Sequence, residues 1–290
     1  MDCTMPTPAL KQSIANGEFI LAPGVFDLIS ALMADSMDFR ALYVTGYGTV
    51  ASYLGIPDAG IATYRDMVER IAQICKRTTT PIIADADTGY GGLLNVRETV
   101  IGYEDVGVSA VQLEDQEFPK KCGHTPNRRV ISISDMQRKI EVAVNSRKSD
   151  NLLIIARTDS RTTFGIDEAI KRGQAYAEAG ADVIFVESPE TEDEMKLAAS
   201  EIKAPLLANI VNGGRTPLVP ADRLAQLGYS IAIHPALGFL AIARSLELAY
   251  GDLLKNGHSS PHIDLYSFAK MNKLMGFEDV WAFEEKWGEQ

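Results

Sequence analysis

The chain has 290 residues, of which 46% are hydrophobic and 23% are charged, a balance that is ordinary for a globular protein. That length can bury a large single core, and no run approaches the roughly 18 apolar residues that a membrane-spanning helix needs. The formal net charge of −11 argues against nucleic acid and anionic membranes as partners, because like charges repel.

Short apolar runs rich in β-branched residues recur along the chain, and helical patterns follow them, which predicts strand–helix units with a parallel sheet. The clearest helical pattern is Tyr64–Arg77, where Met67, Ile71 and Ile74 recur on one face. A second pattern covers residues 166–180 and ends on a glycine. The expected strands are residues 19–24, 41–46, 81–87, 110–115, 152–158, 183–188, 205–210 and 230–235.

Eight such units without a long polar linker predict one closed (β/α)8 TIM barrel of the α/β class over residues 1–256. The competing architecture is an open doubly wound sheet, which is disfavoured because no Gly-x-Gly-x-x-Gly motif follows the first strand. Residues 257–290 form a C-terminal extension with two helix-like, aromatic-rich pieces. We expect this extension to pack either on its own barrel or on a neighbouring subunit, and its pattern favours neither.

Polar residues collect at the C-terminal ends of the predicted strands. In (β/α)8 enzymes this end of the barrel carries the active site. Charged side chains in buried strands are costly unless they are paired or bind a metal. The pattern therefore predicts an active site built from strand ends. The residues concerned are Tyr43, Thr45, Gly46, Asp85, Asp87, Glu114, Asp115, Arg157, Asp159, Glu187, Asn209 and His234.

Asp85 and Asp87 lie two positions apart and therefore share one face of their strand. Two neighbouring carboxylates repel each other unless a cation lies between them. With Glu114 from the next strand they would form an all-oxygen site, which favours Mg²⁺ or Mn²⁺ over zinc. The alternative is that one aspartate caps the following helix while the other pairs with Arg157.

Residues 114–130 are polar and interrupted by proline and glycine, which predicts a loop over the barrel mouth that closes during the reaction. Positive neighbours lower the pKa of a thiol, so Cys122 is a candidate reactive cysteine. Gly123 permits a close approach of the backbone, and His124 can neutralise a carboxylate or an oxyanion. The alternative is a solvated loop with an incidental cysteine. The positive residues of this loop are Lys120, Lys121, Arg128 and Arg129.

Arg157 interrupts a strand that is otherwise apolar. A buried arginine needs an anion, and a substrate carboxylate can accept two hydrogen bonds from its planar guanidinium. Pairing with Glu187 on the next strand is the alternative, and the two interpretations are compatible.

The three cysteines are far apart and form neither a disulfide framework nor a zinc-binding pattern. The N-terminal segment lacks a basic region followed by an apolar one, so it does not resemble a signal peptide. These features suit a reducing compartment, and we expect a cytoplasmic protein.

Several motifs follow one another in a fixed order over nearly the whole chain. They are Tyr43-Val-Thr-Gly, Pro57-Asp58, Asp85-x-Asp87, Glu114-Asp115, Lys121-Cys122-Gly123-His124, Arg157-Thr158-Asp159, Glu187 and Asn209. This combination resembles the isocitrate lyase and phosphoenolpyruvate mutase superfamily. The Lys-Cys-Gly-His segment resembles its lyase branch, and the surrounding FPKKCGH sequence is most similar to the 2,3-dimethylmalate lyases, with the methylisocitrate lyases close to them.

The resemblance implies a Mg²⁺ ion held mainly by Asp87, with Asp85 and Glu114 acting partly through water. It implies that this ion, Arg157 and backbone amides bind an α-keto acid or its enolate. It also implies a homotetramer, a dimer of dimers, in which C-terminal helices are exchanged between paired subunits. The remaining substrate-site residues that it implies are Thr45, Gly46, Tyr47, Asp58, Lys121, Gly123, His124, Glu187 and Asn209.

The implied reaction is the retro-Claisen cleavage of a small 2-hydroxy di- or tricarboxylate, in which Cys122 protonates the departing carbon. We expect Tyr43 to act as the base, with Glu187 as the second choice. Tyr47 is larger than the residue common in methylisocitrate lyases, and this difference puts the identity of the substrate in question. The rival functions are methylisocitrate cleavage, oxaloacetate hydrolysis, rearrangement of a carboxyphosphono compound, and a barrel kept for binding or assembly alone.

Overall fold

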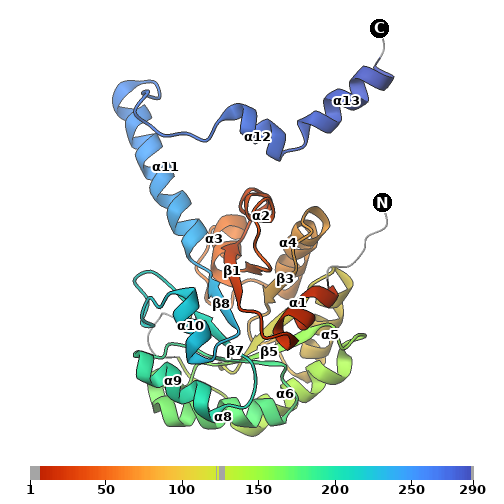
Figure 1. Ribbon diagram of the computed structural model, residues 1–290, viewed down its shortest axis with the longest axis vertical. Helices are drawn as coiled ribbons and strands as arrows, with labels where there is room; N and C mark the ends of the chain where they lie inside the picture. The colour runs from red at the N-terminus through yellow and green to blue at the C-terminus, as the bar shows by residue number, and fades with distance from the viewer. Residues whose placement is uncertain (1–6, 122, 124–127, 289–290) are drawn as a thin grey trace. The chain divides into compact units, whose positions relative to one another are not determined.

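A closed barrel of parallel strands forms the centre of the protein in the computed structural model, which describes residues 7–121, 123 and 128–288. Within these residues eight strands follow the order of the sequence, and β8 pairs with β1 (Figure 1). The predicted (β/α)8 barrel is confirmed, and every strand begins and ends within two residues of its expected limits. The strands are β1 (Ile20–Val25), β2 (Leu42–Val44), β3 (Ile82–Asp85), β4 (Ala110–Glu114), β5 (Leu153–Thr158), β6 (Val183–Val186), β7 (Leu206–Asn209) and β8 (Ile231–His234).

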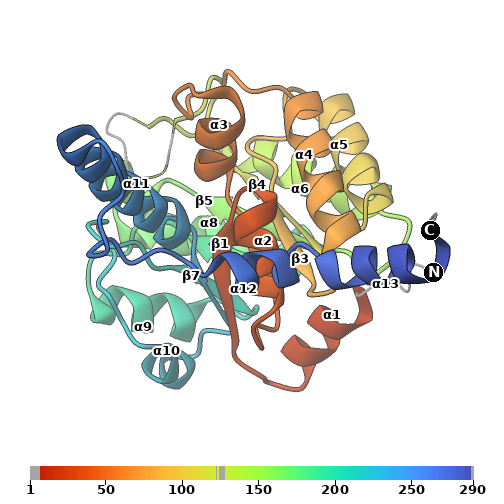
Figure 2. The same ribbon diagram turned by 90° about the horizontal axis from the view of Figure 1, so that it is seen from above.

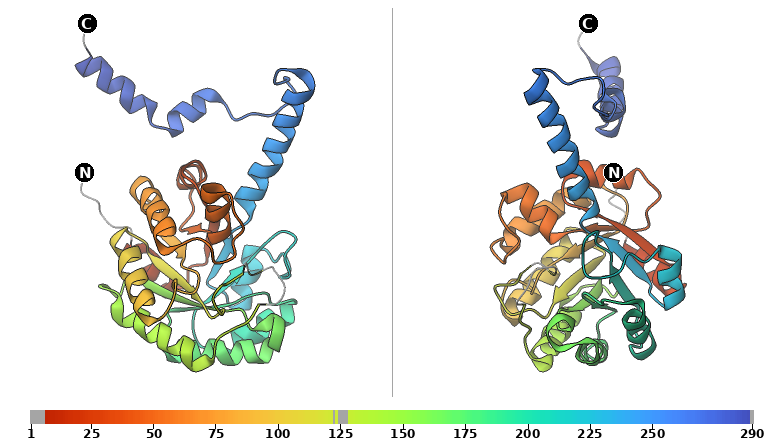
Figure 3. Two further views of the ribbon diagram at one scale, coloured as in Figure 1. Left: turned by 180° about the vertical axis from the view of Figure 1, so that it is seen from behind. Right: turned by 90° about the vertical axis from the view of Figure 1, so that its left-hand side faces the viewer.

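Helices surround the strands, and Figures 2 and 3 show this ring from above, from behind and from one side. Helix α4 (Tyr64–Arg77) has the predicted limits because the Thr63 side chain caps its first turn. Met67, Ile71 and Ile74 are buried on its inner face, as their spacing predicts. The other helices up to the last strand are α1 (Thr7–Ala15), α2 (Leu28–Asp35), α3 (Gly46–Leu54), α5 (Leu93–Asp105), α6 (Ile133–Ser146), α7 (Arg161–Phe164), α8 (Ile166–Glu178), α9 (Glu192–Glu201) and α10 (Ala221–Leu227).

Alternate residues of each strand point into the barrel. Along a strand, the inward-pointing residues are apolar at first, and the last one is polar. On β5, Leu153 and Ile155 pack in the inner apolar cluster, whereas Ile154 and Ala156 pack in the outer cluster with the helices. Arg157 is the next inward residue of the same row. The same alternation brings five polar side chains to one end of the barrel. They are Asp85, Glu114, Arg157, Glu187 and Asn209.

The chain divides into two compact units, residues 1–239 and 240–290. The division falls near the start of α11 (Leu237–Asn256) and not after residue 256, where the sequence analysis ended the barrel domain. The second unit contains the rest of α11, α12 (Phe268–Leu274) and α13 (Phe277–Trp287), and the described residues of these helices include no buried one. Among the helices that the structure describes, none has the length and apolarity required to cross a bilayer. The most exposed apolar side chains of this unit are Tyr250, Leu254, Phe268, Phe283 and Trp287.

Candidate active site

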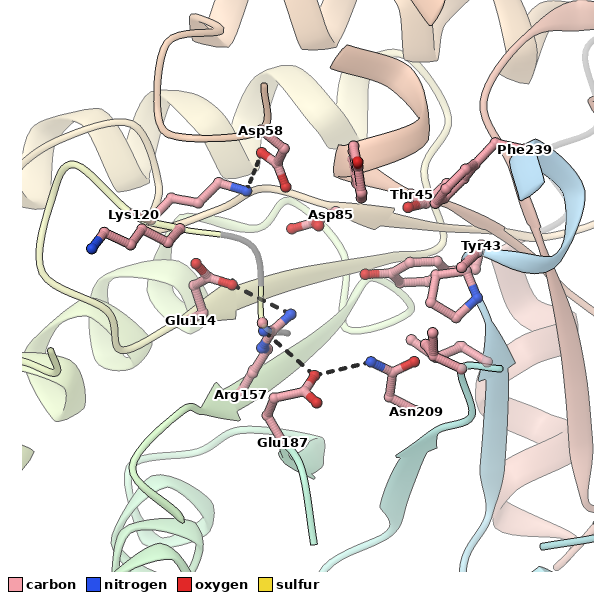
Figure 4. Close-up of a pocket in the computed structure, with 17 residues that line it drawn as sticks. Tyr43, Thr45, Asp58, Asp85, Glu114, Lys120, Arg157, Glu187, Asn209 and Phe239 are labelled. Atoms are coloured by element: carbon pink, nitrogen blue, oxygen red, sulfur yellow. Dashed lines mark hydrogen bonds and ion pairs between the residues drawn. The ribbon is translucent and has the colours of Figure 1, made fainter. Parts of the chain in front are cut away.

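A pocket lies at the C-terminal ends of the barrel strands, where the sequence analysis expects the active site (Figure 4). Eleven of the predicted site residues line it: Tyr43, Thr45, Tyr47, Asp58, Asp85, Glu114, Lys121, Gly123, Arg157, Glu187 and Asn209. The pocket is also lined by six residues that the sequence pattern does not assign to the site: Lys120, Val211, Ile233, Pro235, Ala236 and Phe239.

Asp85 is the last residue of β3, and its carboxylate is held from two sides. Oδ1 accepts hydrogen bonds from the backbone N–H of Asp87, at 3.0 Å, and from the Gln112 side chain, at 3.3 Å. Oδ2 faces Gly46 at the start of α3, where an added Cβ would lie only 2.7 Å from it. Glycine at position 46 therefore lets the backbone approach this carboxylate.

Lys120 connects two buried carboxylates at the edge of the pocket. Its Nζ lies 2.5 Å from Asp58 Oδ1 and 2.6 Å from Asp87 Oδ1, and its side chain is only 3% exposed. Burial raises the pKa of Asp87 to about 7, although the positive charge of Lys120 opposes this shift. Asp87 also has a positive φ of 50°, a conformation that is costly for a residue other than glycine. Sequence reasoning had no means of deciding which of Lys120 and Lys121 would be buried.

Glu114 provides a test of whether this site suits Mg²⁺. Burial raises its pKa well above the usual range, and its Oε1 atom has no hydrogen-bond partner among the described residues. In that same part of the chain, no group of three or more His, Cys, Asp or Glu side chains is close enough to hold a metal ion. The buried Oε1 atom of Glu114 and the Asp85 carboxylate on the same pocket fit a hydrated Mg²⁺ held directly by one or two carboxylates.

Arg157 lies between the carboxylates of three neighbouring strand ends. Its Nε and Nη2 atoms each donate to Asp159 at 2.9 Å, and its guanidinium is 3.4 Å from Glu187 and 3.5 Å from Glu114. The predicted pairing with Glu187 is thus present. An added Cβ at Gly123 would lie 2.2 Å from Arg157 Nη2, so the backbone of the loop lies close to the guanidinium at this glycine.

Tyr43 points into the pocket from β2, and its hydroxyl donates to Gln112 Oε1 at 2.9 Å. Burial, followed by the negative charge of Asp85, raises the pKa of Tyr43 well above 10. Both observations favour the protonated phenol, which is a poor base. The assignment of Tyr43 as the base stays a prediction, with this electrostatic evidence against it.

Glu187 and Asn209 form a hydrogen-bonded pair next to Arg157. The Asn209 amide donates to Glu187 Oε2 at 3.0 Å, and the Ser188 hydroxyl donates to Glu187 Oε1 at 2.9 Å. The side-chain oxygen of Asn209, Oδ1, is buried and has no hydrogen-bond partner among residues 7–121, 123 and 128–288. It is therefore available to a hydroxyl or protonated group of a substrate.

The side of the pocket formed by β7, β8 and the residues after them is largely apolar. Val211, Pro235 and Phe239 lie there, and the Phe239 ring packs against Tyr47 with 5.0 Å between ring centres. The pocket thus has a charged side and an apolar side.

Four predicted site residues are not among the described residues that line the pocket. Gly46 and Asp87 lie next to Asp85, which does line the pocket. Cys122 and His124 lie outside the residues that the structure describes, so their assigned roles stay predictions.

Comparisons with known proteins agree with this architecture. The family model described as phosphoenolpyruvate phosphomutase matches residues 10–253. The chain is 43% identical over 279 residues to a 2,3-dimethylmalate lyase of Eubacterium barkeri, with 96% of each chain covered. It is 38% identical over 275 residues to a 2-methylisocitrate lyase of Aeropyrum pernix, which covers 94% of this chain and 88% of the relative.

Two kinds of solved structure superimpose closely on the protein. A crystal structure of 2,3-dimethylmalate lyase has a TM-score of 0.91 and 34% identity, covering 98% of this chain and 96% of that one. A structure of oxaloacetate acetylhydrolase with the inhibitor 3,3-difluorooxalacetate has a TM-score of 0.92 and 30% identity, covering 99% and 98%. The chain is therefore an enzyme that belongs to the phosphoenolpyruvate mutase and isocitrate lyase superfamily.

Proposed function

We propose that the protein is a Mg²⁺-dependent carbon–carbon lyase that cleaves a small 2-hydroxy diacid, such as 2,3-dimethylmalate, into an α-keto acid and a carboxylic acid. The observation that carries this proposal is the Glu114 Oε1 atom, which is buried beside Asp85 and Arg157 and has no hydrogen-bond partner within the part of the chain that the structure describes. A buried carboxylate oxygen that accepts no hydrogen bond is costly, and a cation bound next to it would remove that cost.

Asp87, Asp85 and Glu114 are the residues that would hold Mg²⁺. When bound, the ion would supply positive charge next to the oxygens on which negative charge develops during cleavage. Such electrostatic stabilisation is usually the largest contribution to catalysis. Mn²⁺ has the same preference for oxygen ligands and is the alternative ion.

The residues of the chain then divide the remaining work. Arg157 and the backbone N–H groups of Gly46 and Tyr47 bind and orient the carboxylate of the substrate. The base removes the proton of the 2-hydroxyl, the C2–C3 bond breaks, and its electron pair leaves with C3. Cys122 donates its proton to C3 and acts as the general acid. Tyr43 and Glu187 remain the two candidates for the base, and a comparison of Tyr43→Phe with Glu187→Gln separates them.

The apolar side of the pocket supports an alkyl-substituted diacid as the substrate. Val211, Pro235 and Phe239 offer methyl groups an apolar surface, and no described cation lines this side to receive a third carboxylate. A 2,3-dimethylmalate lyase is also among the most similar relatives. Oxaloacetate hydrolysis is the second candidate, because the TM-score of 0.92 was obtained with an oxaloacetate acetylhydrolase.

We also propose a cytoplasmic homotetramer in which residues 257–290 pack on a neighbouring subunit. The support is the exposed apolar surface of α12 and α13, which includes Phe268, Phe283 and Trp287. Monomeric proteins rarely expose large contiguous apolar surfaces. Replacing Phe283 with glutamate should lower the mass measured by light scattering, and an unchanged tetramer, or a monomeric parent protein, would contradict the proposal.

The proposed reaction is tested with purified protein, Mg²⁺ and four compounds: 2,3-dimethylmalate, 2-methylisocitrate, oxaloacetate and phosphonopyruvate. We expect the fastest turnover with 2,3-dimethylmalate, measured as formation of the keto acid, whereas turnover of oxaloacetate is measured as loss of its keto group. Cys122→Ser should bind ligand normally and turn over about 10²–10⁴ times more slowly. Cys75→Ser is the matched control, since Cys75 lies on α4 outside the pocket-lining residues. A fully active Cys122→Ser protein would refute the general-acid role.

A further inference from the structure

Two arginines are adjacent in the sequence after β4, and one is buried whereas the other is exposed. The Arg128 side chain is 1% exposed, whereas the Arg129 side chain is 79% exposed and pairs with Glu117 on the surface. The backbone around them is fixed to the end of β4, because Glu117 N–H donates to Arg129 C=O at 2.9 Å. A buried arginine is costly unless its charge and its hydrogen bonds are satisfied.

The main partner of Arg128 is a carboxylate that also holds the arginine of the pocket. Arg128 Nη1 donates to Asp159 Oδ1, and its Nη2 donates to Thr162 Oγ1 at 2.6 Å. Arg157 donates to the same Oδ1 atom from Nη2 and to Oδ2 from Nε, both at 2.9 Å. The Asp159 carboxylate therefore joins two guanidinium groups. Arg157 is among the described residues that line the pocket, and Arg128 is not.

The charges explain why this arrangement matters for an anionic substrate. Besides Asp159, Arg157 faces Glu187 at 3.4 Å and Glu114 at 3.5 Å. If Arg157 alone compensated Asp159, its positive charge would be shared among three carboxylates and little would remain to attract a further anion. Arg128, which does not line the pocket, supplies a second positive charge next to Asp159.

The geometry adds a second effect. The paired hydrogen bonds to Asp159 fix the plane of the Arg157 guanidinium, and planar orientation is what a bidentate carboxylate contact requires. Asp159 is itself held by Arg128 and by its backbone N–H, which donates to Asp115 at 2.9 Å. Loss of Arg128 would free the carboxylate to rotate, and Arg157 would lose its fixed orientation.

We propose that Arg128 is a positioning residue for anion binding: acting through Asp159, it keeps the Arg157 guanidinium oriented and electrostatically available to the substrate carboxylate. The proposal rests on the proposed function only in that Arg157 binds an anion. It does not require that the bound anion be cleaved, or that Cys122 be the acid.

The test compares Arg128→Met with its neighbour Arg129→Met as the matched control. Binding of oxalate, a small dicarboxylate, is measured by calorimetry in the presence of Mg²⁺, and kcat and KM are measured for 2,3-dimethylmalate. Arg128→Met should weaken oxalate binding by about 10- to 100-fold, the usual effect of losing a charged hydrogen-bonding partner behind a binding group. Arg129→Met should change it less than about 2-fold, because exposed ion pairs contribute little.

Two further variants separate positioning from folding. Arg128→Lys keeps the charge but cannot bond to Asp159 and Thr162 at once, so its binding defect should lie between those of the parent and Arg128→Met. Added guanidinium ion should restore oxalate binding to Arg128→Ala and not to Arg157→Ala.

Equal oxalate affinity in Arg128→Met and Arg129→Met would overturn the positioning role, and so would a failure of guanidinium to rescue folded Arg128→Ala. If Arg128→Met fails to fold, Arg128→Lys decides the question by the same comparison. A parent protein that binds no oxalate would overturn this inference together with the proposed function. A parent that binds oxalate and loses it in Arg128→Met, but cleaves none of the four compounds, would overturn the proposed function alone.

Discussion

Glu114 and Asp115 are adjacent acidic residues, yet the protein uses them in opposite ways. Glu114 faces the pocket, and its Oε1 atom has no hydrogen-bond partner in the described part of the chain. Asp115 points to the helices, and its Oδ2 atom accepts hydrogen bonds from Thr158, Arg172 and Tyr176 at 2.7–3.0 Å. Successive strand residues face opposite sides, so one acidic pair supplies both a poorly satisfied carboxylate and a well satisfied one.

The difference in hydrogen bonding separates carboxylates that can bind a ligand from carboxylates that stabilise the fold. A buried carboxylate that accepts few hydrogen bonds can gain free energy by binding a cation. A carboxylate whose hydrogen bonds are all made stabilises the fold and gains little from a further ligand. Asp85 and Asp87 resemble Glu114 in lining or bordering the pocket, and Asp159 resembles Asp115 in having strong partners. Arg157 contacts members of both groups and connects them.

The largest effect is expected from Asp115→Asn. Removing the charge leaves Arg172 short of a buried counter-ion, and breaking such a pair costs about 3–5 kcal/mol. We expect a lower midpoint in urea denaturation, with turnover per folded molecule largely kept. Asp105→Asn, at an exposed ion pair, is the control and should cost less than about 1 kcal/mol. Unchanged stability of Asp115→Asn would remove the distinction between the two carboxylates.

Glu114→Gln should show the reverse behaviour. Burial raises the pKa of Glu114 well above the usual range, so replacing its charge should leave the urea midpoint unchanged or higher. Loss of a group that holds or orients the metal should lower kcat/KM by about 10- to 100-fold. Steady-state kinetics at saturating Mg²⁺ measure this effect. A destabilised but active Glu114→Gln protein would show that the roles of the two residues are exchanged.

Gly123→Ala sharpens the comparison at the junction of the two groups. The added methyl group would lie 2.2 Å from Arg157 Nη2, so either the loop or the guanidinium must move. Overpacking of this kind costs about 1–3 kcal/mol, and we expect it to appear as a higher KM because Arg157 is displaced. Gly92→Ala is the matched control, since an added Cβ there meets nothing within 4 Å. Equal KM values for the two variants would argue against the close contact at Gly123.

Addition of Mg²⁺ should give the smallest change. At ten times its dissociation constant, a ligand of the folded state stabilises it by about 1.4 kcal/mol. The melting temperature should rise accordingly, EDTA should reverse the rise, and Asp87→Asn should abolish it. If Mg²⁺ raised the melting temperature of Asp87→Asn as much as that of the parent protein, the ion would bind elsewhere.

The fold could be predicted because it depends on local patterns. Each strand is a short apolar run, and the spacing of Met67, Ile71 and Ile74 defines the buried face of α4. The limits of β2 were predicted less well. Thr45 and Gly46 read as its continuation, but they form the N-cap and the first residue of α3.

The site could be predicted where one strand end supplies both the residue and its direction, as for Asp85 and Arg157. It could not be predicted where a contact joins distant segments. Asp115 meets Tyr176 across 61 positions, and no local pattern links them. Phe239 was missed because an apolar residue at the start of a helix has the same pattern whether it faces a core or a pocket.

The two sides of the pocket come from different strands, and this has an evolutionary consequence. The charged side is carried by β2 to β6 with the loop after β4, whereas β7, β8 and the residues up to Phe239 supply most of the apolar side. Changes in the last two strands and their loops can thus alter which molecule is accepted while the bond-breaking apparatus is inherited intact. Enzymes with this barrel can thus change their substrate through substitutions in β7, β8 and the loops that follow them.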